Sequence, residues 1–153
     1  MFAPKKILVP IDFSEGSKKA LKFATSLAAP FDAQVEVVHV WQPPAFLSAE
    51  LVVLDPEANG VSLEDWVEAE AGRALASFLE EAKEEGGTLL PSRLVRGEPT
   101  EVIPKLAKDE GVDLLVMGTH GRTGVARMLA GSVTEHTVRV AGCPVLTVPP
   151  DRD

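Results

Sequence analysis

Five short hydrophobic runs recur along this chain, each bounded by polar or glycine-containing segments. The first, Ile7-Leu8-Val9-Pro10-Ile11-Asp12, is nearly continuous, which is typical of a strand buried on both faces. Pro91 lies in the third run and lacks the N–H that a central strand needs, so we expect that strand at a sheet edge. The predicted strands cover residues 7–12, 33–41, 89–96, 113–117 and 144–148.

Between these runs, apolar residues recur at helical spacing and polar residues take the opposite positions. The first predicted helix covers residues 16–29, with Asp12 and Ser14 as candidate caps. The second starts at Ser62-x-x-Asp65, which resembles a capping box, and ends at Gly86-Gly87.

The third predicted helix begins at Pro99 and closes at Gly111, and Pro104 inside it predicts a kink or a later start. The fourth begins at a second capping box, Ser132-x-x-Glu135. Its expected inward face consists of Val133, Thr137, Val140 and Ala141.

Strands and helices thus alternate along the whole chain, which calls for right-handed crossovers and a mostly parallel sheet. The sequence predicts one doubly wound α/β domain over residues 1–153, with helices on both faces of the sheet. The connection over residues 42–63 is longer than usual and is either a lid or a mobile segment.

Composition limits the partners that this domain can have. The 153 residues include 23 acidic and 15 basic side chains, for a formal net charge of -8. Phosphate backbones and anionic membranes would repel such a chain, so we expect neither nucleic acid nor membrane as a partner. Cys143 is the single cysteine and no apolar leader opens the sequence, so we expect a cytoplasmic protein without disulfides.

The acidic excess is concentrated in one segment. Residues 57–85 hold nine acidic side chains against Arg73 and Lys83, and we interpret them as the solvated face of the second helix.

A glycine pattern follows the fourth predicted strand and carries the most specific chemical signal. In Gly118-x2-Gly121-x9-Gly131-Ser132, glycines allow close approach of an oxyanion, and a helix begins where its free amides and dipole favour negative charge. The Ser132 hydroxyl can donate to a phosphate oxygen, and Arg122 lies in the same loop. No G-x-x-x-x-G-K-[ST] motif is present, which excludes a P-loop NTPase.

These residues resemble the nucleotide-binding branch of the universal stress protein family over essentially the whole chain. The resemblance rests on the opening strand to Asp12, His39-Val40, the segment from Leu115 to Gly121, Gly131-Ser132, and the segment from Cys143 to Val148. It implies a sheet of order 3-2-1-4-5 and a homodimer formed through the last strand, residues 144–148. The long 42–63 connection and Pro104 depart from the pattern of the family.

The resemblance also implies a ligand, ATP or else AMP or ADP, with Mg²⁺ on the phosphates. Asp12 would approach the ribose or the metal ion, and Val40 would offer backbone groups to adenine. The nucleotide-binding candidates are Pro10, Ile11, Asp12, Val40, Met117, Gly118, His120, Gly121, Arg122, Gly131, Ser132 and Val133. Trp41 can either stack on adenine or point away along the alternating strand.

Three functions fit this sequence. The first is an adenine-nucleotide-binding regulator of the stress response, in which occupancy changes a loop or a dimer. The second is a slow ATPase or nucleotidyl transferase, for which Asp12 and His120 are the only evident candidate bases. The third is a non-catalytic interaction dimer with an empty site.

Overall fold

The computed structural model describes residues 1–44, 52–53, 60–84, 90–119 and 131–149. A five-stranded parallel sheet forms its centre, in the order β5-β2-β1-β6-β7. Its strands are β1 (Lys6–Pro10), β2 (Gln34–Trp41), β5 (Ser92–Arg96), β6 (Leu114–Gly118) and β7 (Val145–Val148). Counted along the chain, these five strands have the expected order 3-2-1-4-5, so the predicted fold class is confirmed.

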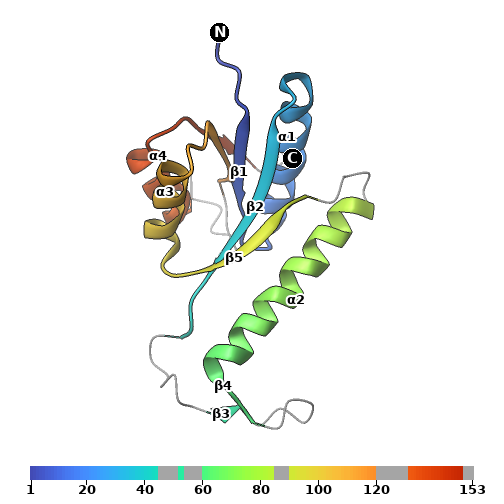
Figure 1. Ribbon diagram of the computed structural model, residues 1–153, viewed down its shortest axis with the longest axis vertical. Coiled ribbons are helices and arrows are strands. Elements are labelled where there is room, and N and C mark those ends of the chain that lie inside the picture. Colours follow the sequence, from blue (N-terminus) through green and yellow to red (C-terminus); the bar gives the residue numbers. More distant parts are fainter. Residues whose placement is uncertain (45–51, 54–59, 85–89, 120–130, 150–153) are drawn as a thin grey trace.

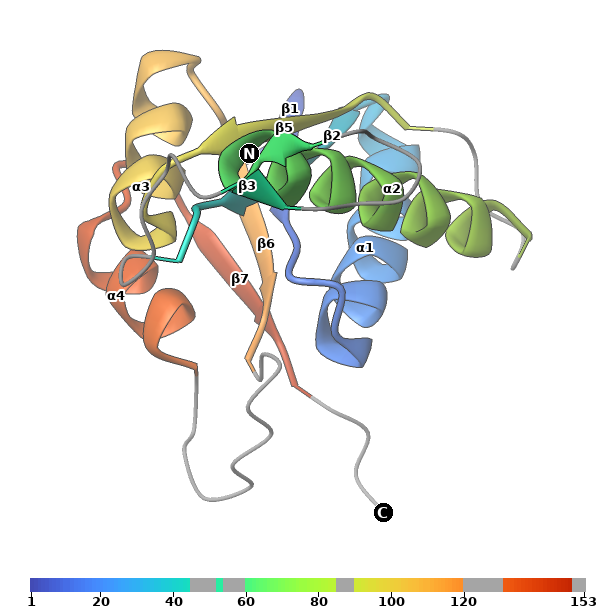
Figure 2. The same ribbon diagram turned by 90° about the horizontal axis from the view of Figure 1, so that it is seen from below.

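Helices cover both faces of the sheet, as the doubly wound class requires (Figure 1, Figure 2). On one face lie α1 (Glu15–Ala28), which continues into the short 3-10 turn η1 (Ala29–Phe31), and α2 (Leu63–Glu84). On the other face lie α3 (Pro99–Asp109) and α4 (Ser132–Val140). Each face has its own hydrophobic core.

The central strand β1 supplies both cores because its side chains alternate across the sheet. Ile7 and Val9 belong to the core under α1 and α2, whereas Leu8 belongs to the core under α3 and α4. All three side chains have no exposed surface. This confirms that the first hydrophobic run is a strand buried on both faces.

Two details of the third strand and the third helix differ from expectation. β5 begins at Ser92, so Pro91 precedes the strand rather than lying in it, and its carbonyl accepts a hydrogen bond from the N–H of Val37. The helix α3 begins at Pro99 and runs through Pro104, so the predicted late start is wrong. Ile103 and Ala107 are buried against the sheet on either side of Pro104 and hold both parts of the helix in place.

The long connection after β2 contains a small hairpin that the hydrophobic pattern does not predict. β3 (Val52–Val53) and β4 (Val61–Ser62) pair in antiparallel orientation directly before α2. Ser62 caps α2, as its place in the predicted capping box requires, since its hydroxyl accepts from the Asp65 N–H at 3.1 Å. The same hydroxyl donates to Asp65 Oδ2 at 2.7 Å. The lid interpretation depends on residues 45–51 and 54–59, which lie outside the described residues.

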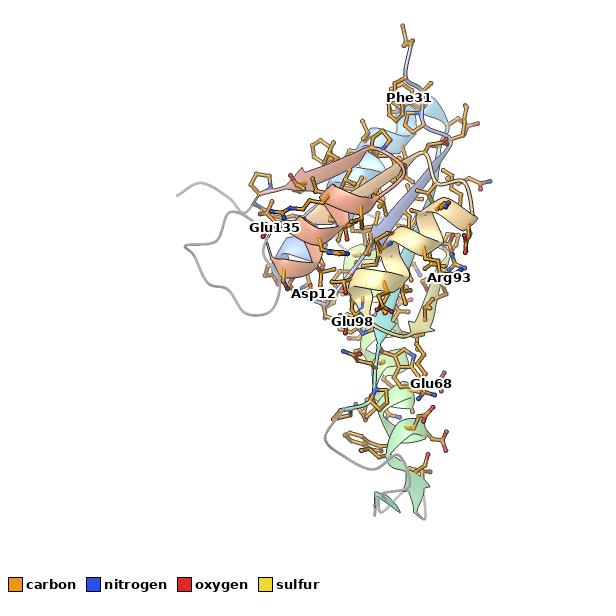
Figure 3. The ribbon with its side chains drawn as sticks, turned by 90° about the vertical axis from the view of Figure 1, so that its left-hand side faces the viewer. Asp12, Phe31, Glu68, Arg93, Glu98 and Glu135 are labelled. Carbon is orange, nitrogen blue, oxygen red and sulfur yellow. The ribbon has the colours of Figure 1, made fainter. Side chains whose placement is uncertain are left out.

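The first half of α2 extends past the carboxyl end of the strands (Figure 1). Glu68 lies on this extension (Figure 3). Most acidic side chains of α2 are exposed: Asp65, Glu68, Glu70, Glu80, Glu81 and Glu84. The interpretation of the acidic segment as a solvated helix face is therefore supported for its described part. No helix within the described ranges is long and apolar enough to cross a membrane.

An ion-pair network closes the amino end of the sheet. Lys6 Nζ lies 2.8 Å from Glu110 Oε2, Arg93 Nη2 lies 2.7 Å from Glu110 Oε1, and Arg93 Nε lies 2.9 Å from Glu36 Oε1. The Lys6 ammonium, and next the Arg93 guanidinium, hold the pKa of Glu110 below its usual value. Backbone N–H groups of Lys5 and Lys6 likewise lower the pKa of Asp113.

This network predicts a stability loss in acid. A lowered folded-state pKa contributes stability that is present above the unfolded-state value of 4.5 for Glu110 and is lost as the pH falls through the folded value. We expect Glu110→Gln to flatten the fall in the free energy of unfolding between about pH 5 and about pH 3. Urea titrations at each pH measure it, with the exposed Glu101→Gln as control; an unchanged slope in Glu110→Gln would contradict the assignment.

Candidate functional site

A cavity of about 230 Å³ opens at the carboxyl ends of β1, β2 and β6. In Figure 3, Asp12 and Glu98 lie at mid-height, above the extension of α2 that carries Glu68, and Phe31 lies near the top, toward the amino ends of the strands. This is the switch point of the topology, where the chain reverses its direction across the sheet and where ligands of open α/β sheets bind. The described residues that line the cavity are Pro10, Ile11, Asp12, Ser17, His39, Val40, Pro99, Ile103, Met117, Gly118, Gly131, Ser132, Val133 and Thr134.

Most residues predicted from the sequence meet at this cavity. Nine of the twelve candidates line it: Pro10, Ile11, Asp12, Val40, Met117, Gly118, Gly131, Ser132 and Val133. The other three, His120, Gly121 and Arg122, lie outside the described residues. The structure therefore brings the described candidates together, and their contact with a ligand stays a prediction.

Pro10 limits the pairing of β1 with β6 beside the cavity. Leu115 donates its N–H to Pro144 on the β7 side, so strand alternation directs the carbonyl of Val116 toward β1. The residue of β1 that would bond to this carbonyl is Pro10, which has no N–H. Pairing between the two strands accordingly ends at Leu8 and Leu115, although β6 continues to Gly118.

Asp12 is held at the cavity by the start of α1. Its Oδ1 accepts hydrogen bonds from the Ser17 hydroxyl at 2.7 Å and from the Ser14 N–H at 3.1 Å. The Ser17 hydroxyl also accepts from the Asp12 N–H at 3.0 Å, and Ser14 caps the helix by accepting from the Ser17 N–H at 3.2 Å. Ser14 is thus the N-cap, while Asp12 precedes the cap and is oriented by Ser17.

The fourth helix begins differently from the predicted capping box, and the difference changes the site. The N-cap is Gly131, without a side-chain cap bond, and Ser132 is the first helical residue. Glu135 pairs with Arg139 at 2.6 Å instead of returning to the cap. The first turn of α4, Gly131 to Thr134, lines the cavity, so the positive end of the helix dipole faces it. Val140, expected to face inward, is 49% exposed.

Gly118 has a packing role that the glycine pattern does not reveal. A Cβ added there would lie 2.8 Å from the carbonyl carbon and oxygen of Gly16 at the start of α1. The end of β6 and the first turn of α1 are therefore in backbone contact. The Gly118 carbonyl also accepts from the Thr134 hydroxyl at 2.9 Å, which ties α4 to the same point.

The other side of the cavity is mostly apolar. Gly97 adopts φ +147° between β5 and α3, a conformation that L side chains rarely adopt, and the turn brings Pro99 and Ile103 to the cavity beside Val40. Trp41 is only 6% exposed and lies under the Arg96 guanidinium, 6.0 Å from the ring centroid. It does not line the cavity, so of the two alternatives for Trp41 the structure supports the side chain that points away.

Five lining residues were not among the sequence candidates: Ser17, His39, Pro99, Ile103 and Thr134. Ser17 follows Asp12 by five positions and could have been suspected as its partner, since serine near a helix start often bonds to neighbouring polar groups. Pro99 and Ile103 carry only the ordinary pattern of a helix start and its apolar face. Nothing in the sequence assigns them to this cavity.

Known proteins resemble this chain in sequence and in fold. The model of the universal stress protein family matches residues 4–149. Universal stress protein MJ0531 of Methanocaldococcus jannaschii is 35% identical over 144 residues, which cover 94% of this chain and 81% of that protein. The structure of protein MJ0577 from the same organism has a TM-score of 0.77, with 34% identity over 99% of each chain. A universal stress protein crystallised in complex with cAMP has a TM-score of 0.68 and 26% identity, over 96% of this chain and 98% of that one.

The contact between Gly118 and Gly16 predicts that a single methyl group disturbs the site. Gly118→Ala should lower the free energy of unfolding by about 1–3 kcal/mol, because backbone cannot move aside as a flexible side chain can. Gly142→Ala is the matched control, since nothing lies within 4 Å of a Cβ added there. Chemical denaturation compares the two variants, and equal stability would show that α1 and β6 are not in contact at Gly118.

Proposed function

Because the chain belongs to the universal stress protein family, we propose that it binds an adenine nucleotide at the carboxyl end of its sheet and responds with a change in a loop or a dimer. The observation that carries the proposal is the cavity itself, which joins the first turn of α4 to the last residues of β2. A nucleotide has one anionic end and one flat aromatic end, and the two sides of this cavity differ in the same way.

The α4 side fits the phosphates. The N–H groups of the first helical turn have no intrahelical partners, and the N-cap residue Gly131 has no side chain. Ser132 adds a hydroxyl donor on the same turn. We expect His120, Gly121 and Arg122 to complete this side.

The β2 side fits the base. The carbonyl of Val38 accepts from the Ile11 N–H, so Val38 faces β1. Residues two apart in a strand direct their N–H and C=O groups to the same side, so those of Val40 also point toward the β1 side. They lie beyond Pro10, the last residue of β1. An adenine edge presents an acceptor next to a donor and matches this pair. Pro99 and Ile103 supply apolar contact for the face of the ring.

Asp12 lies between the two sides and fits a ribose hydroxyl or a magnesium ion on the phosphates. Among the described residues no group of three histidine, cysteine, aspartate or glutamate side chains is arranged to hold a metal ion. A magnesium ion would therefore depend on the phosphate oxygens for most of its ligands, with Asp12 as the contribution of the protein.

The relative crystallised with cAMP supports the choice of an adenine nucleotide. ATP, with AMP or ADP as alternatives, is the ligand we propose, and a cytoplasmic location suits a protein that responds to it. Regulation of a stress response is the role that the family name suggests for such binding.

We also propose that the protein forms a homodimer through β7. This strand is a sheet edge, and its four residues, Val145 to Val148, include no charge. Unprotected edges of this kind invite pairing with another strand. Val138 and Val140 are about half exposed on α4, which directly precedes β7, and a second copy would cover apolar surface there as well.

Calorimetric titration of the purified protein with ATP and AMP tests the binding proposal. We expect Asp12→Ala to weaken ATP binding mainly when magnesium is present, because a carboxylate near phosphates needs a bridging cation. Asp109→Ala, which removes an exposed carboxylate from the far end of α3, is the control.

Equal losses with and without magnesium would assign Asp12 to the ribose instead. No binding of either nucleotide by the unmutated protein would contradict the proposal. Sustained release of phosphate from ATP over many turnovers would show that the protein is an ATPase rather than a binding regulator.

A charge on the edge strand tests the dimer. Thr147 is the exposed residue of β7, so Thr147→Lys leaves both cores intact while a two-fold contact would bring two ammonium groups together. The control is Ser77→Lys, which places the same charge at an exposed position of α2. We expect light scattering to show dimers for the unmutated protein and for Ser77→Lys, and monomers for Thr147→Lys. A monomeric unmutated protein at micromolar concentration would contradict the dimer.

A further inference from the structure

His39 lies near the carboxyl end of β2, lines the cavity, and contacts Ile11 and Phe13. Its ring nitrogen Nδ1 lies 2.8 Å from the carbonyl oxygen of Ile11, and its ring packs on Phe13 with centroids 4.2 Å apart. A carbonyl oxygen can only accept, so Nδ1 carries the proton that is shared with Ile11. The imidazole therefore donates a hydrogen bond to the backbone carbonyl of Ile11, just after the end of β1.

The register of the sheet shows which backbone N–H the Ile11 carbonyl would accept from if the ladder continued. The residues of β2 that face β1 alternate: the Gln34 N–H donates to Lys5 at 2.8 Å, and the Val38 carbonyl accepts from the Ile11 N–H at 2.9 Å. Continuation of this parallel ladder by one bond would join the N–H of Val40 to the carbonyl of Ile11. That backbone bond is not formed in the structure, although both residues are described.

We propose that His39 is a positioning residue that ends the β1–β2 ladder one bond early and thereby keeps the N–H of Val40 available to a ligand. A free Ile11 carbonyl would capture this N–H, because nearly all buried backbone donors in proteins are paired. A ligand would then have to break a backbone hydrogen bond before it could form its own.

The part of the proposal that concerns the base rests on the proposed function, since it takes a nucleobase as the ligand of Val40. The part that concerns the ladder does not, because it describes the protein without ligand. The two parts are tested separately.

Two substitutions at His39 and one elsewhere separate the effect of the Nδ1–H hydrogen bond from the effects of packing and of losing a histidine. His39→Leu removes the donor and keeps an apolar side chain against Phe13, whereas His39→Asn places an amide nitrogen close to the position of Nδ1. His136→Leu, at an exposed position of α4, controls for the loss of a histidine.

Hydrogen exchange of the ligand-free protein, followed by NMR, tests the ladder. In the unmutated protein the Val40 amide should exchange faster than the Val38 amide, which is bonded within the sheet. We expect His39→Leu to slow exchange at Val40 by about tenfold as the bond to Ile11 forms, while His39→Asn and His136→Leu stay near the unmutated rate. Slow exchange at Val40 in the unmutated protein, or no change in His39→Leu, would overturn the proposal.

Titration with AMP and with ribose 5-phosphate tests the effect on the base. His39→Leu should weaken AMP binding by about tenfold and leave ribose 5-phosphate binding unchanged, because only AMP carries the base. His39→Asn should restore the AMP affinity. Equal weakening of both ligands would overturn a base-specific role, whereas fast Val40 exchange together with no AMP binding by the unmutated protein would overturn the proposed function and leave the ladder intact.

Discussion

A proline at the end of the central strand limits how far this sheet can be paired. Pro10 stands where β1 would donate its next hydrogen bond to Val116, and it has no N–H to give. The β1–β6 ladder ends two residues before β1 does, and from there to Gly118 β6 is paired only with β7. This end of the ladder lies at the topological switch point, and Pro10 is one of the residues that line the cavity there.

The elements around the cavity then fix the polar groups that face it. The chain leaves β1 through Asp12, whose carboxylate is held by Ser17, and enters α1 at the cap Ser14. Backbone contact between Gly16 and Gly118 ties this corner to β6, and the Thr134 hydroxyl ties α4 to the same carbonyl. The part of the cavity wall formed by α1, Gly118 and α4 is therefore built from backbone and short side chains, which move little and need little ordering when a ligand binds.

The sequence predicted the residues of this site well at positions where the backbone conformation or hydrogen bonding requires a particular residue type. Proline, glycine and an aspartate after a buried strand are visible in the chain, and the described candidates among them meet at one cavity. The prediction for Ser132 was wrong because the sequence Ser-x-x-Glu is the same whether the N-cap is Ser132 or the preceding Gly131. The extended backbone of Gly131 makes that glycine the N-cap. His39 was missed because its importance comes from the pairing register of β1 and β2, which no local pattern encodes.

The charge of the chain and the chemistry proposed for the cavity are compatible because they lie in different places. The excess of acidic residues is concentrated in and around α2, and Glu68 lies on its extension, well removed from Asp12 (Figure 3). Among the described lining residues, Asp12 is the only acidic side chain and no lysine or arginine is present. From these described residues, attraction for an anion comes from the amides of α4, which act over a few ångströms, whereas repulsion from solvated carboxylates is screened over about 8 Å at physiological ionic strength. Short-range dipoles can thus dominate at the cavity of an acidic protein.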